Sequence, residues 1–554
     1  MLTTEVTNFN LTPVGGDPLP ILTIKSEQVE RRIPFDPGGS LRDILDGADV
    51  RVRAGCRGTG ACGLCLVRIE AGHIGAPGPN ENTYLDASQL AQGIRLACQV
   101  IPEQNLQIVI LAPAPKTDWR SLPPEDERRN GRARSFPLGD APTEVKKPYG
   151  VAVDLGTSHL SLSLFDLTSG EYLAGRYGPN PQMFFGSDVM TRLVTASESS
   201  RQAQVMSRQI VKAIGEALLD IALREGVDLQ RVVRLALVGN TAMLALLSGR
   251  NYNRLVQPSH WTKAVDCLPG NTETWAEVWG IHPEANIQVI PPLAGFVGSD
   301  LLAGVVATRL TENSAGCLLI DFGANSEIAL WDGQALWVTS AAGGPAFEGS
   351  GIECGLPAEP GAVYRVSAHQ NGILDFAVIG GEQPRGICGS GLVDLIANLV
   401  KTGRLTNMGR FTKSVPGNEF TLVKGEPDIV LTKGGVDVFQ RGKAAIGAGV
   451  HVLLAQADMR YKDLRRICVG GAFGSFLNIA NAQAIGLLPK IRPELVELHG
   501  NTALAGCEDA MLSHVAAQRL AHLRDRLKII NLSQCLDFDD IFLEHLYLQP
   551  LRGE

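Results

Sequence analysis

The stretch Cys56-Arg-Gly-Thr-Gly-Ala-Cys62-Gly-Leu-Cys65 places three cysteines at the spacing C-x5-C-x2-C, and Cys98 follows in Arg95-Leu-Ala-Cys98. Thiolates are soft ligands of iron–sulfur clusters, and four of them complete a [2Fe–2S] site. Glycines between the first three cysteines let the backbone curl around such a cluster, because glycine readily adopts positive φ angles. The pattern predicts that Cys56, Cys62, Cys65 and Cys98 hold a [2Fe–2S] cluster, which carries one electron at a time.

Zinc and disulfide bonds are the alternatives for these cysteines. Zinc sites usually show two paired C-x2-C arms, whereas here Cys98 stands alone. Disulfides require an oxidising compartment. Cys354 and Cys388 lack the C-x2-C partner that a second cluster would need. Both are therefore interpreted as buried thiols of a reducing cytoplasm. The same interpretation applies to the other single cysteines, which are Cys267, Cys317, Cys468, Cys507 and Cys535.

The length and charge of the chain limit the class of protein to which it can belong. The 554 residues correspond to about three or four domains. The formal net charge of −8 argues against nucleic acid as a main partner. We expect no membrane span and no signal peptide, because the sequence contains neither a run of about 18 apolar residues nor a basic start before an apolar core. The histidines show no metal-ligand spacing. A cytoplasmic protein is expected.

Residues 1–20 are interpreted as a loose lead-in and residues 21–111 as the first domain. Alternation and capping patterns predict strands over 21–25, 29–35, 66–70 and 106–111, and a helix over 40–46 that starts at a capping serine. The cysteine spacing and the Arg-Leu-Ala-Cys98 segment resemble the adrenodoxin-like [2Fe–2S] ferredoxins. This resemblance implies an α+β domain with their β-grasp fold.

Residues 112–148 differ in composition from both neighbours. They contain seven prolines and 14 charged residues, which indicates a linker that is stiffened by proline and kept out of any core. Such a linker lets the cluster domain move between an electron donor and an acceptor. A simple spacer is the alternative interpretation.

A strand that ends in an aspartate and a glycine turn occurs twice, as Gly150-Val-Ala-Val-Asp154 and Gly316-Cys-Leu-Leu-Ile-Asp321. This echo predicts a duplicated domain. The backbone N–H groups of such turns can cradle phosphate, and the aspartates can hold Mg²⁺ or orient water. The predicted nucleotide-binding residues of the two turns are Gly156, Thr157, Ser158, Gly323, Ala324 and Asn325, with Asp154 and Asp321 as catalytic residues.

A third glycine turn follows the strand that starts near Ile467. Its residues Gly470, Gly471, Phe473 and Gly474 are predicted to bind the adenosine. The three motifs resemble the actin, sugar kinase and heat-shock chaperone (ASKHA) superfamily, which implies an actin-like ATPase domain over 149–554. Its two ribonuclease H-like α/β lobes would cover about 149–315 and 316–554. Glu348 is a candidate catalytic ligand of Mg²⁺ or water, or equally a structural ion-pair partner.

The combination of both halves resembles the reductive activators of corrinoid-dependent enzymes. The resemblance implies an ATP-dependent iron–sulfur reductase that returns inactive Co(II) to Co(I) in a corrinoid protein or methyltransferase. An electron donor reductase or ferredoxin is then required, and the chain could form a homodimer. The segments that carry the resemblance are Asn180-Pro-Gln182, Val238-Gly-Asn-Thr241, Phe296-Val-Gly-Ser-Asp300, Gly343-Gly-Pro-Ala-Phe-Glu-Gly349, Gly386-Ile-Cys-Gly-Ser-Gly391 and Gly470-Gly-Ala-Phe-Gly474.

Some positions depart from the family pattern. Ala324 stands where a threonine is usual, which removes a hydroxyl near the phosphates and is compatible with slow hydrolysis. Ala245 stands where a histidine is expected. Three rival functions remain at this stage. They are an ATP-driven electron donor to another metalloenzyme, a small-molecule kinase with a fused redox sensor, and a nucleotide-gated redox binding module without turnover.

Overall fold

The computed structural model describes residues 19–25, 30–48, 50, 52, 58, 60, 63, 65–111, 119–123, 136–140, 145–186, 188–323, 325–343, 347, 351–369, 373–425, 428–471, 473 and 476–551. The chain forms two compact units. The first consists of Met1–Lys116 with Phe184–Ser187, and the second of Thr117–Met183 with Asp188–Glu554. Most of the predicted lead-in over residues 1–20 falls outside the described residues. None of the described helices is long and apolar enough to cross a membrane.

The first unit contains one mixed sheet of five strands in the order β2-β1-β5-β3-β4. Strands β1 and β5 are parallel, and the other neighbouring strands are antiparallel. This arrangement, with α1 packed through Leu41 and Leu45 into the core, is the β-grasp fold. The elements are β1 (Ile21–Lys25), β2 (Glu30–Pro34), α1 (Leu41–Gly47), β3 (Leu66–Ala71), α2 (Pro79–Tyr84), α3 (Ala87–Ala91), β4 (Ile94–Leu96) and β5 (Leu106–Ile110).

The predicted strands and the predicted helix of this unit are present within one or two residues of their expected bounds. Helix α1 begins after Ser40, whose hydroxyl accepts a hydrogen bond from the Asp43 backbone N–H in a capping box. The short elements α2, α3 and β4 were not predicted. They are too short for a hydrophobic period to show, and they lie between the cysteine loop and Cys98.

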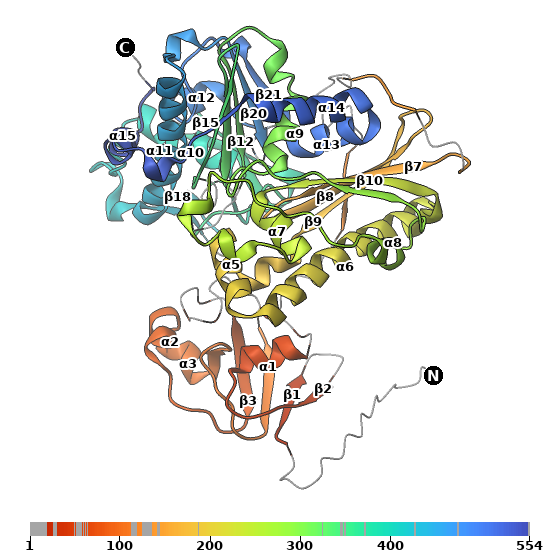
Figure 1. Ribbon diagram of the computed structural model, residues 1–554. Helices are drawn as coiled ribbons and strands as arrows, with labels where there is room; N and C mark the ends of the chain where they lie inside the picture. Colours follow the sequence, from red (N-terminus) through yellow and green to blue (C-terminus); the bar gives the residue numbers. More distant parts are fainter. Residues whose placement is uncertain are drawn as a thin grey trace. The chain divides into compact units, whose positions relative to one another are not determined.

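The second unit contains two six-stranded sheets of matching topology (Figure 1). Their orders are β11-β10-β7-β8-β9-β6 and β21-β20-β12-β13-β14-β22. In each sheet an antiparallel meander of three strands is followed by two parallel strands on its other side. The predicted duplication is confirmed by this repeat, because β7 and β12 occupy equivalent positions.

The bounds of the first sheet and its helices are β6 (Arg120–Ser121), β7 (Tyr149–Leu155), β8 (His159–Asp166), β9 (Tyr172–Pro179), α5 (Val189–Glu198), α6 (Ser200–Glu225), β10 (Val232–Gly239), α7 (Thr241–Ser248), α8 (Glu273–Trp279), β11 (Asn286–Val289) and α9 (Ser299–Ala307). The second sheet is built from β12 (Cys317–Phe322), β13 (Ser326–Trp331), β14 (Leu336–Ala341), β20 (Arg466–Gly471), β21 (Val496–Gly500) and β22 (Leu527–Ile529).

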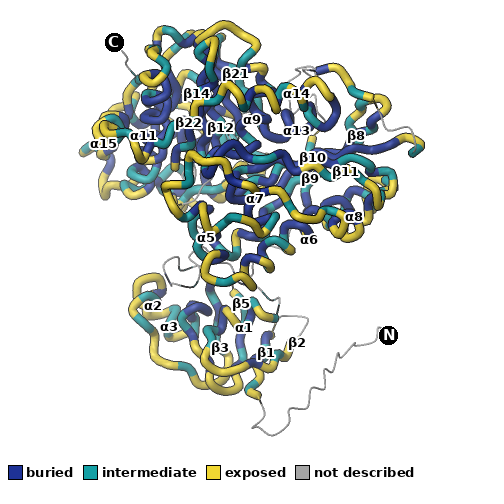
Figure 2. The backbone as a smooth tube through the Cα atoms, in the orientation of Figure 1, coloured by how far each residue is buried: buried dark blue, intermediate teal, exposed yellow. Residues whose placement is uncertain are grey.

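The remaining elements of the second unit are β15 (Ala362–Ala368), β16 (Leu374–Val378), β17 (Gly386–Ile387), α10 (Gly389–Lys401), β18 (Glu419–Val423), β19 (Ile429–Thr432), α11 (Lys433–Gln456), α12 (Ile479–Ala484), α13 (Thr502–Leu512), α14 (His514–Leu523) and α15 (Phe538–Glu544). Helices α10, α11 and α12 contribute to one core together with the second sheet. Figure 2 shows the central strands of both sheets in the colour of buried residues.

Helices α9 and α13 lie together between the two sheets. A core cluster combines residues of both sheets with residues of α9, α13 and α14. The two helices approach so closely that a Cβ on Gly506 would lie 2.0 Å from the Ala303 carbonyl oxygen. Helix α13 also contacts the first sheet, since Glu508 accepts a hydrogen bond from the Ser163 hydroxyl at 2.8 Å. These two helices therefore connect the two lobes.

Residues 112–148 were predicted to form a linker outside any core, and this prediction is wrong for part of the segment. Arg120–Ser121 form β6, which pairs with β9 at the edge of the first sheet. Trp119 is 6% exposed, and Phe136 is 8% exposed within the core between the sheets. Large aromatic side chains gain enough from burial to be drawn into a neighbouring core despite the surrounding prolines and charges.

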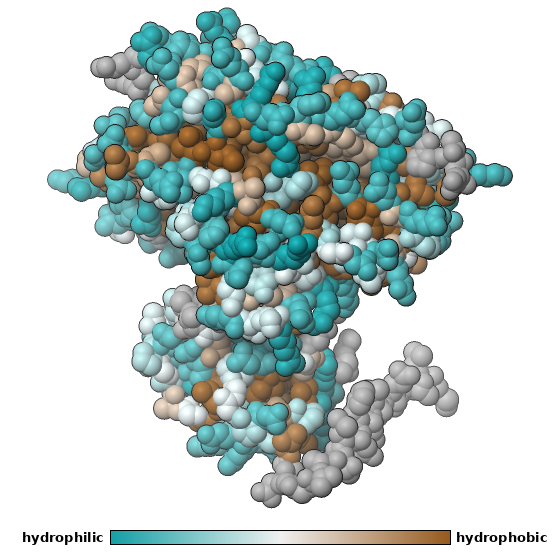
Figure 3. Space-filling model, in the orientation of Figure 1, coloured by the Kyte–Doolittle hydropathy of each residue, from teal (hydrophilic) through white to brown (hydrophobic). Residues whose placement is uncertain are grey.

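A cavity of about 660 Å³ lies where α11 meets α15 and the segment after it. Its lining includes Met408, Gln440, Arg441, Phe542 and Tyr547. Figure 3 shows hydrophobic patches between hydrophilic residues on the drawn face of the second unit. None of the predicted site residues lines this cavity.

Candidate functional site

Asp154 and Asp321 occupy equivalent positions in the two sheets. Each is the penultimate residue of the equivalent strand of its sheet, β7 or β12, close to the turn into an antiparallel strand. Withdrawal from solvent raises the pKa of Asp154 to about 7, a hydrogen bond from Asn501 opposes the shift, and the charge of Asp321 adds to it. Withdrawal from solvent also raises the pKa of Asp321 to about 6, against the hydrogen bond from Thr502.

A third carboxylate, that of Asp300, joins these two. It lies in the first turn of α9, where its Oδ1 accepts a hydrogen bond from the Leu301 backbone N–H at 2.8 Å. Withdrawal from solvent raises its pKa, and the charges of Asp154 and Asp321 add to the rise. The three half-buried carboxylates thus repel one another, which is the electrostatic condition of a site for a divalent cation.

The start of α13 contacts two of these aspartates through consecutive residues. The Asn501 side-chain amide donates to Asp154 Oδ2 at 2.7 Å, and the Thr502 hydroxyl donates to Asp321 Oδ2 at 2.5 Å. The Asn501 Oδ1 also caps the helix by accepting from the Leu504 N–H at 2.8 Å. These hydrogen bonds fix the orientation of both carboxylates.

The first phosphate-loop candidate is held from several sides. The Asn180 side chain donates to the Gly156 carbonyl at 2.8 Å, and buried Arg192 donates to the Thr157 carbonyl at 2.8 Å. The Thr157 hydroxyl accepts from the Asn240 amide at 2.9 Å. The Ser158 carbonyl accepts from the Asn180 N–H at 2.8 Å. The loop therefore has a fixed backbone in which Ser158 remains half-buried and Thr157 is buried.

The adenosine-motif glycines lie beside the second aspartate. Gly471 has φ +78°, and a Cβ there would lie 2.0 Å from the Phe322 carbonyl oxygen, so a larger residue does not fit. A Cβ on Gly470 would lie 2.8 Å from the Thr502 hydroxyl. These glycines allow β20 to approach Asp321 closely.

Phe473 points away from solvent. Its ring is 1% exposed and packs edge-on against Phe322 and Phe347, with centroids 4.9 and 5.2 Å apart. Its side chain therefore supports the core, and only its backbone is left for ligand contact, in contrast to the sequence-based expectation. Gly323 and Asn325 are half-buried at the second turn. Three predicted positions lie outside the described residues, namely Ala324, Glu348 and Gly474.

In the first unit the structure brings two of the predicted cluster ligands together. The Sγ atoms of Cys65 and Cys98 lie 3.4 Å apart without a disulfide between them. The hydrogen bond from Cys65 lowers the pKa of Cys98, and burial opposes this shift. Two sulfurs on one tetrahedral metal at about 2.3 Å each would be about 3.8 Å apart, so the pair fits two corners of one iron. Cys56 and Cys62 lie outside the described residues.

A buried ion pair supports the segment that carries Cys98. Glu81 is 0% exposed, and its carboxylate accepts two hydrogen bonds from Arg95 at 2.7 Å and one from the Leu96 N–H at 3.1 Å. Burial works against the charged form, but these bonds hold the pKa of Glu81 below its usual value. The backbone just before Cys98 is therefore anchored to α2.

Three residues of the site were not singled out from the sequence as site residues, namely Asp300, Asn501 and Thr502. Asp300 was noticed within a segment that resembles the family. The capping asparagine before an apolar helix could have located the start of α13, whereas α9 begins after Gly298 without a side-chain cap. It could not show that both helix starts face the two aspartates. Ala245, where a histidine was expected, is fully buried in α7.

Together the two units combine a [2Fe–2S]-type ferredoxin fold with a two-lobed ASKHA-type domain that carries three carboxylates between its lobes. Comparison with known families agrees. Residues 24–103 match the 2Fe–2S iron–sulfur cluster binding domain, residues 149–313 the RACo middle region, and residues 315–552 the C-terminal ASKHA domain of RACo. The chain belongs to the RACo family.

Individual relatives agree with this assignment. The corrinoid activation enzyme RamQ of Eubacterium limosum is 33% identical over 392 residues, which are 67% of this chain and 65% of RamQ. A Co(II) methylated amine-specific corrinoid protein reductase of Methanosarcina barkeri is 29% identical over 66% of this chain and 70% of its own. A solved structure, a reductive activator for a corrinoid, iron–sulfur protein, matches with a TM-score of 0.66 and 26% identity over 96% of this chain and 98% of its own. The match to RamQ spans slightly less than two thirds of that relative's length.

Proposed function

We propose that this chain is an ATP-dependent reductive activator that reduces the Co(II) form of a corrinoid protein or corrinoid-dependent methyltransferase to Co(I). The single observation that carries the proposal is the union, in one chain, of the Cys65–Cys98 thiol pair with the carboxylates of Asp154, Asp300 and Asp321. The first group supplies the ligands of an electron carrier. The second supplies a nucleotide site of the ASKHA type. The names of RamQ and of the Methanosarcina reductase support the corrinoid substrate.

The nucleotide residues are assigned by their positions. Asp154, Asp300 and Asp321 would hold Mg²⁺, directly or through water, because hard cations prefer carboxylate oxygens. The N–H groups of the loop at Gly156, Thr157 and Ser158 would receive phosphate oxygens. Asn501 and Thr502 would keep the aspartates oriented. Their hydrogen bonds also favour the ionised carboxylates that a cation requires.

A reduced [2Fe–2S] cluster held by the first unit would supply the one electron that converts Co(II) to Co(I), and would itself return to the oxidised state. A donor reductase or ferredoxin must then reduce the cluster again. The four cysteines Cys56, Cys62, Cys65 and Cys98 are proposed as its ligands. A plant-type [2Fe–2S] centre lies near about −400 mV, and a one-electron gap of about 59 mV changes the equilibrium tenfold. ATP binding or hydrolysis is proposed to offset an unfavourable gap.

The experiment uses the full chain with its cluster loaded and chemically reduced, mixed with a Co(II) corrinoid protein. Co(I) is followed by the cobalamin absorption bands with and without Mg-ATP. We expect Co(I) to accumulate only with Mg-ATP, and Asp321→Asn to abolish this effect while leaving the cluster spectrum unchanged. Asp375→Asn, an exposed aspartate on β16, is the matched control. Equal Co(I) without ATP would instead support a nucleotide-gated binding module.

A further inference from the structure

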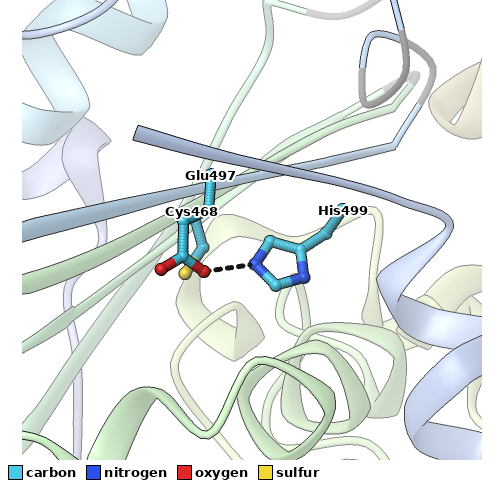
Figure 4. A group of neighbouring side chains, drawn as sticks. All are labelled: Cys468, Glu497 and His499. Carbon is cyan, nitrogen blue, oxygen red and sulfur yellow. Dashed lines mark hydrogen bonds and ion pairs between the residues drawn. The ribbon is translucent and has the colours of Figure 1, made fainter. Parts of the chain in front are cut away.

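Cys468, Glu497 and His499 form a group of possible metal ligands outside the carboxylate site. Cys468 lies on β20 and is paired in register with Glu497 on the parallel strand β21. His499 follows Glu497 by two residues, at the point where the register of the two strands shifts between Val469 and Gly470. One ligand atom of each side chain lies within 4.8 Å of the others. Figure 4 shows the imidazole directed at the carboxylate, with the sulfur beside it.

The surroundings of this group are those of an enclosed site. Cys468 is 0% exposed, and the side chains of His499 and Glu497 are 9% and 27% exposed. The His499 Nε2 lies 3.1 Å from Glu497 Oε2. Arg466 donates to both oxygens of the Glu497 carboxylate, at 3.0 and 2.8 Å. The carboxylate is therefore fixed in one orientation and available from the side of His499 and Cys468.

We propose that Cys468, Glu497 and His499 bind a divalent transition metal of the zinc class. A thiolate, an imidazole nitrogen and a carboxylate oxygen are the three ligand types that zinc takes in proteins, and a water molecule would complete a tetrahedron. On binding, the Cys468 thiol loses its proton to solvent, and the neutral imidazole of His499 binds through Nε2 with its proton on Nδ1. The thiolate and the carboxylate carry two negative charges against the two positive charges of the metal, and Arg466 beside the carboxylate adds one further positive charge.

An ion-pair network without metal is the competing explanation. Arg466, Glu497 and His499 alone would form such a network. The two explanations differ in one observable, because only a metal would bring the Cys468 sulfur into the same coordination sphere as Glu497 and His499. The sequence showed no metal-ligand spacing among the histidines, because the three side chains come from two strands that meet only in the folded sheet. The inference is independent of the proposed corrinoid activity.

The place of the group gives the metal a structural role. Cys468 is two residues before Gly470, and His499 is two residues before Asn501. A metal bound there would tie β20 to β21 directly before the two segments that contact Asp321 and Asp154. Occupancy would therefore stabilise the second lobe at the base of the nucleotide site.

The test uses the full chain with its iron–sulfur cluster loaded, freed of loose metal by a chelator and then titrated with zinc chloride. We expect the parent to retain one more zinc per chain than His499→Ala or Cys468→Ser after desalting, with equal iron content in all three. Cys535→Ser and His514→Ala are the matched controls and should retain as much zinc as the parent. Zinc misplaced at the cluster cysteines would be common to every variant and cancels in the difference.

X-ray absorption at the zinc edge gives a second measurement. The parent should show one sulfur and several nitrogen or oxygen neighbours, and the sulfur contribution should be lost in Cys468→Ser. Zinc should also raise the unfolding temperature of the parent by more than that of His499→Ala, because any zinc at the three aspartates stabilises both proteins equally. Equal zinc retention by the parent and His499→Ala, or a zinc spectrum without sulfur, would overturn the proposal and leave the ion-pair network. His499→Ala keeps the test valid if Cys468→Ser fails to fold.

Discussion

The hydroxyl of Thr502 donates a hydrogen bond to the carboxylate of Asp321 across 2.5 Å. Thr502 begins α13, whereas Asp321 lies near the end of β12, 181 residues earlier in the chain. The bond stabilises the ionised form of an aspartate whose pKa is otherwise raised by its withdrawal from solvent. Helix α13 therefore contributes directly to the charge state of the proposed nucleotide site.

Thr502→Val should reduce nucleotide turnover, because the isosteric methyl group cannot donate to Asp321. A hydrogen bond to a charged group contributes about 1.5–3 kcal/mol, which corresponds to about a tenfold to hundredfold loss. The pH profile should also shift upward, since the pKa of Asp321 loses its lowering influence. Thr502→Ser retains the hydroxyl and should behave like the parent in both assays. A Val variant with an unchanged pH profile would contradict this role.

Affinity for Mg-nucleotide should rise with pH between about 6 and 8. The pKa of Asp154 is raised to about 7 and that of Asp321 to about 6, and Mg²⁺ must displace the protons of these carboxylates. Without Mg²⁺ the same pKa shifts make the folded protein less stable as pH rises. The unfolded aspartates ionise near pH 4, so the raised folded pKa values reduce the free energy of unfolding as pH rises from about 4 to 7. Calorimetric titration with Mg-nucleotide at several pH values measures the first effect.

Asp300→Asn separates these two effects. The neutral amide removes one of three mutually repelling charges, so the Mg²⁺-free protein should be more stable to denaturant above pH 7 than the parent. The same variant should bind Mg-nucleotide more weakly, because one carboxylate is missing. Lower stability of the Mg²⁺-free variant would show that Asp300 does not repel Asp154 and Asp321 as inferred.

Cys98→Ser should lose most of the visible absorption and iron of the parent. The Cys98 thiol is activated, since its neighbour Cys65 lowers its pKa and favours the thiolate that binds iron. Cys354→Ser is the matched control, because burial raises the pKa of that thiol to about 11 and keeps it protonated. Iron content and the visible spectrum decide the comparison, and an unchanged spectrum in Cys98→Ser would exclude Cys98 as a ligand.

Lys443→Met should stabilise the second unit. Lys443 is 0% exposed, and its ammonium lies 3.5 Å from the Gly486 carbonyl. Burial lowers its pKa to about 7, so the parent loses stability as pH falls from about 10.5 to 7 and no further below. The gain in the free energy of unfolding should approach about 5 kcal/mol near pH 7 as an upper limit and vanish above pH 10.

Tryptophan fluorescence during urea unfolding measures this gain. All six tryptophans lie within the chain segments of the second unit. Lys212→Met, an exposed lysine on α6, is the control and should show no pH-dependent gain. A gain for Lys443→Met that does not change with pH would reflect packing alone.

Much of the architecture could be predicted because it is encoded locally. The alternation in residues 21–25, the capping serine before α1 and the repeated strand–turn at Asp154 and Asp321 each depend on neighbouring residues in the sequence. The match between the two sheets could be predicted for that reason. The failure at Trp119 and Phe136 has the opposite origin. Their composition indicates a linker, but their burial depends on a core formed by distant segments.

The carboxylate site shows the same limit. Asp154 and Asp321 were predicted from an internal repeat, whereas Asp300, Asn501 and Thr502 come from helix starts whose positions the sequence does not reveal. Phe473 lies next to predicted binding glycines, but its ring turns into the core formed by Phe322 and Phe347. Sequence spacing identifies the motif, and only the packing decides which side chains face the ligand.

Asn501 and Thr502 are joined by one peptide unit, which keeps their Cα atoms about 3.8 Å apart. One contacts Asp154 of the first lobe and the other contacts Asp321 of the second. Both contacts require the two lobes to keep their present spacing here, so a separation of the lobes would break at least one of them. The dipeptide therefore couples the spacing of the two lobes to the hydrogen bonding of both aspartates.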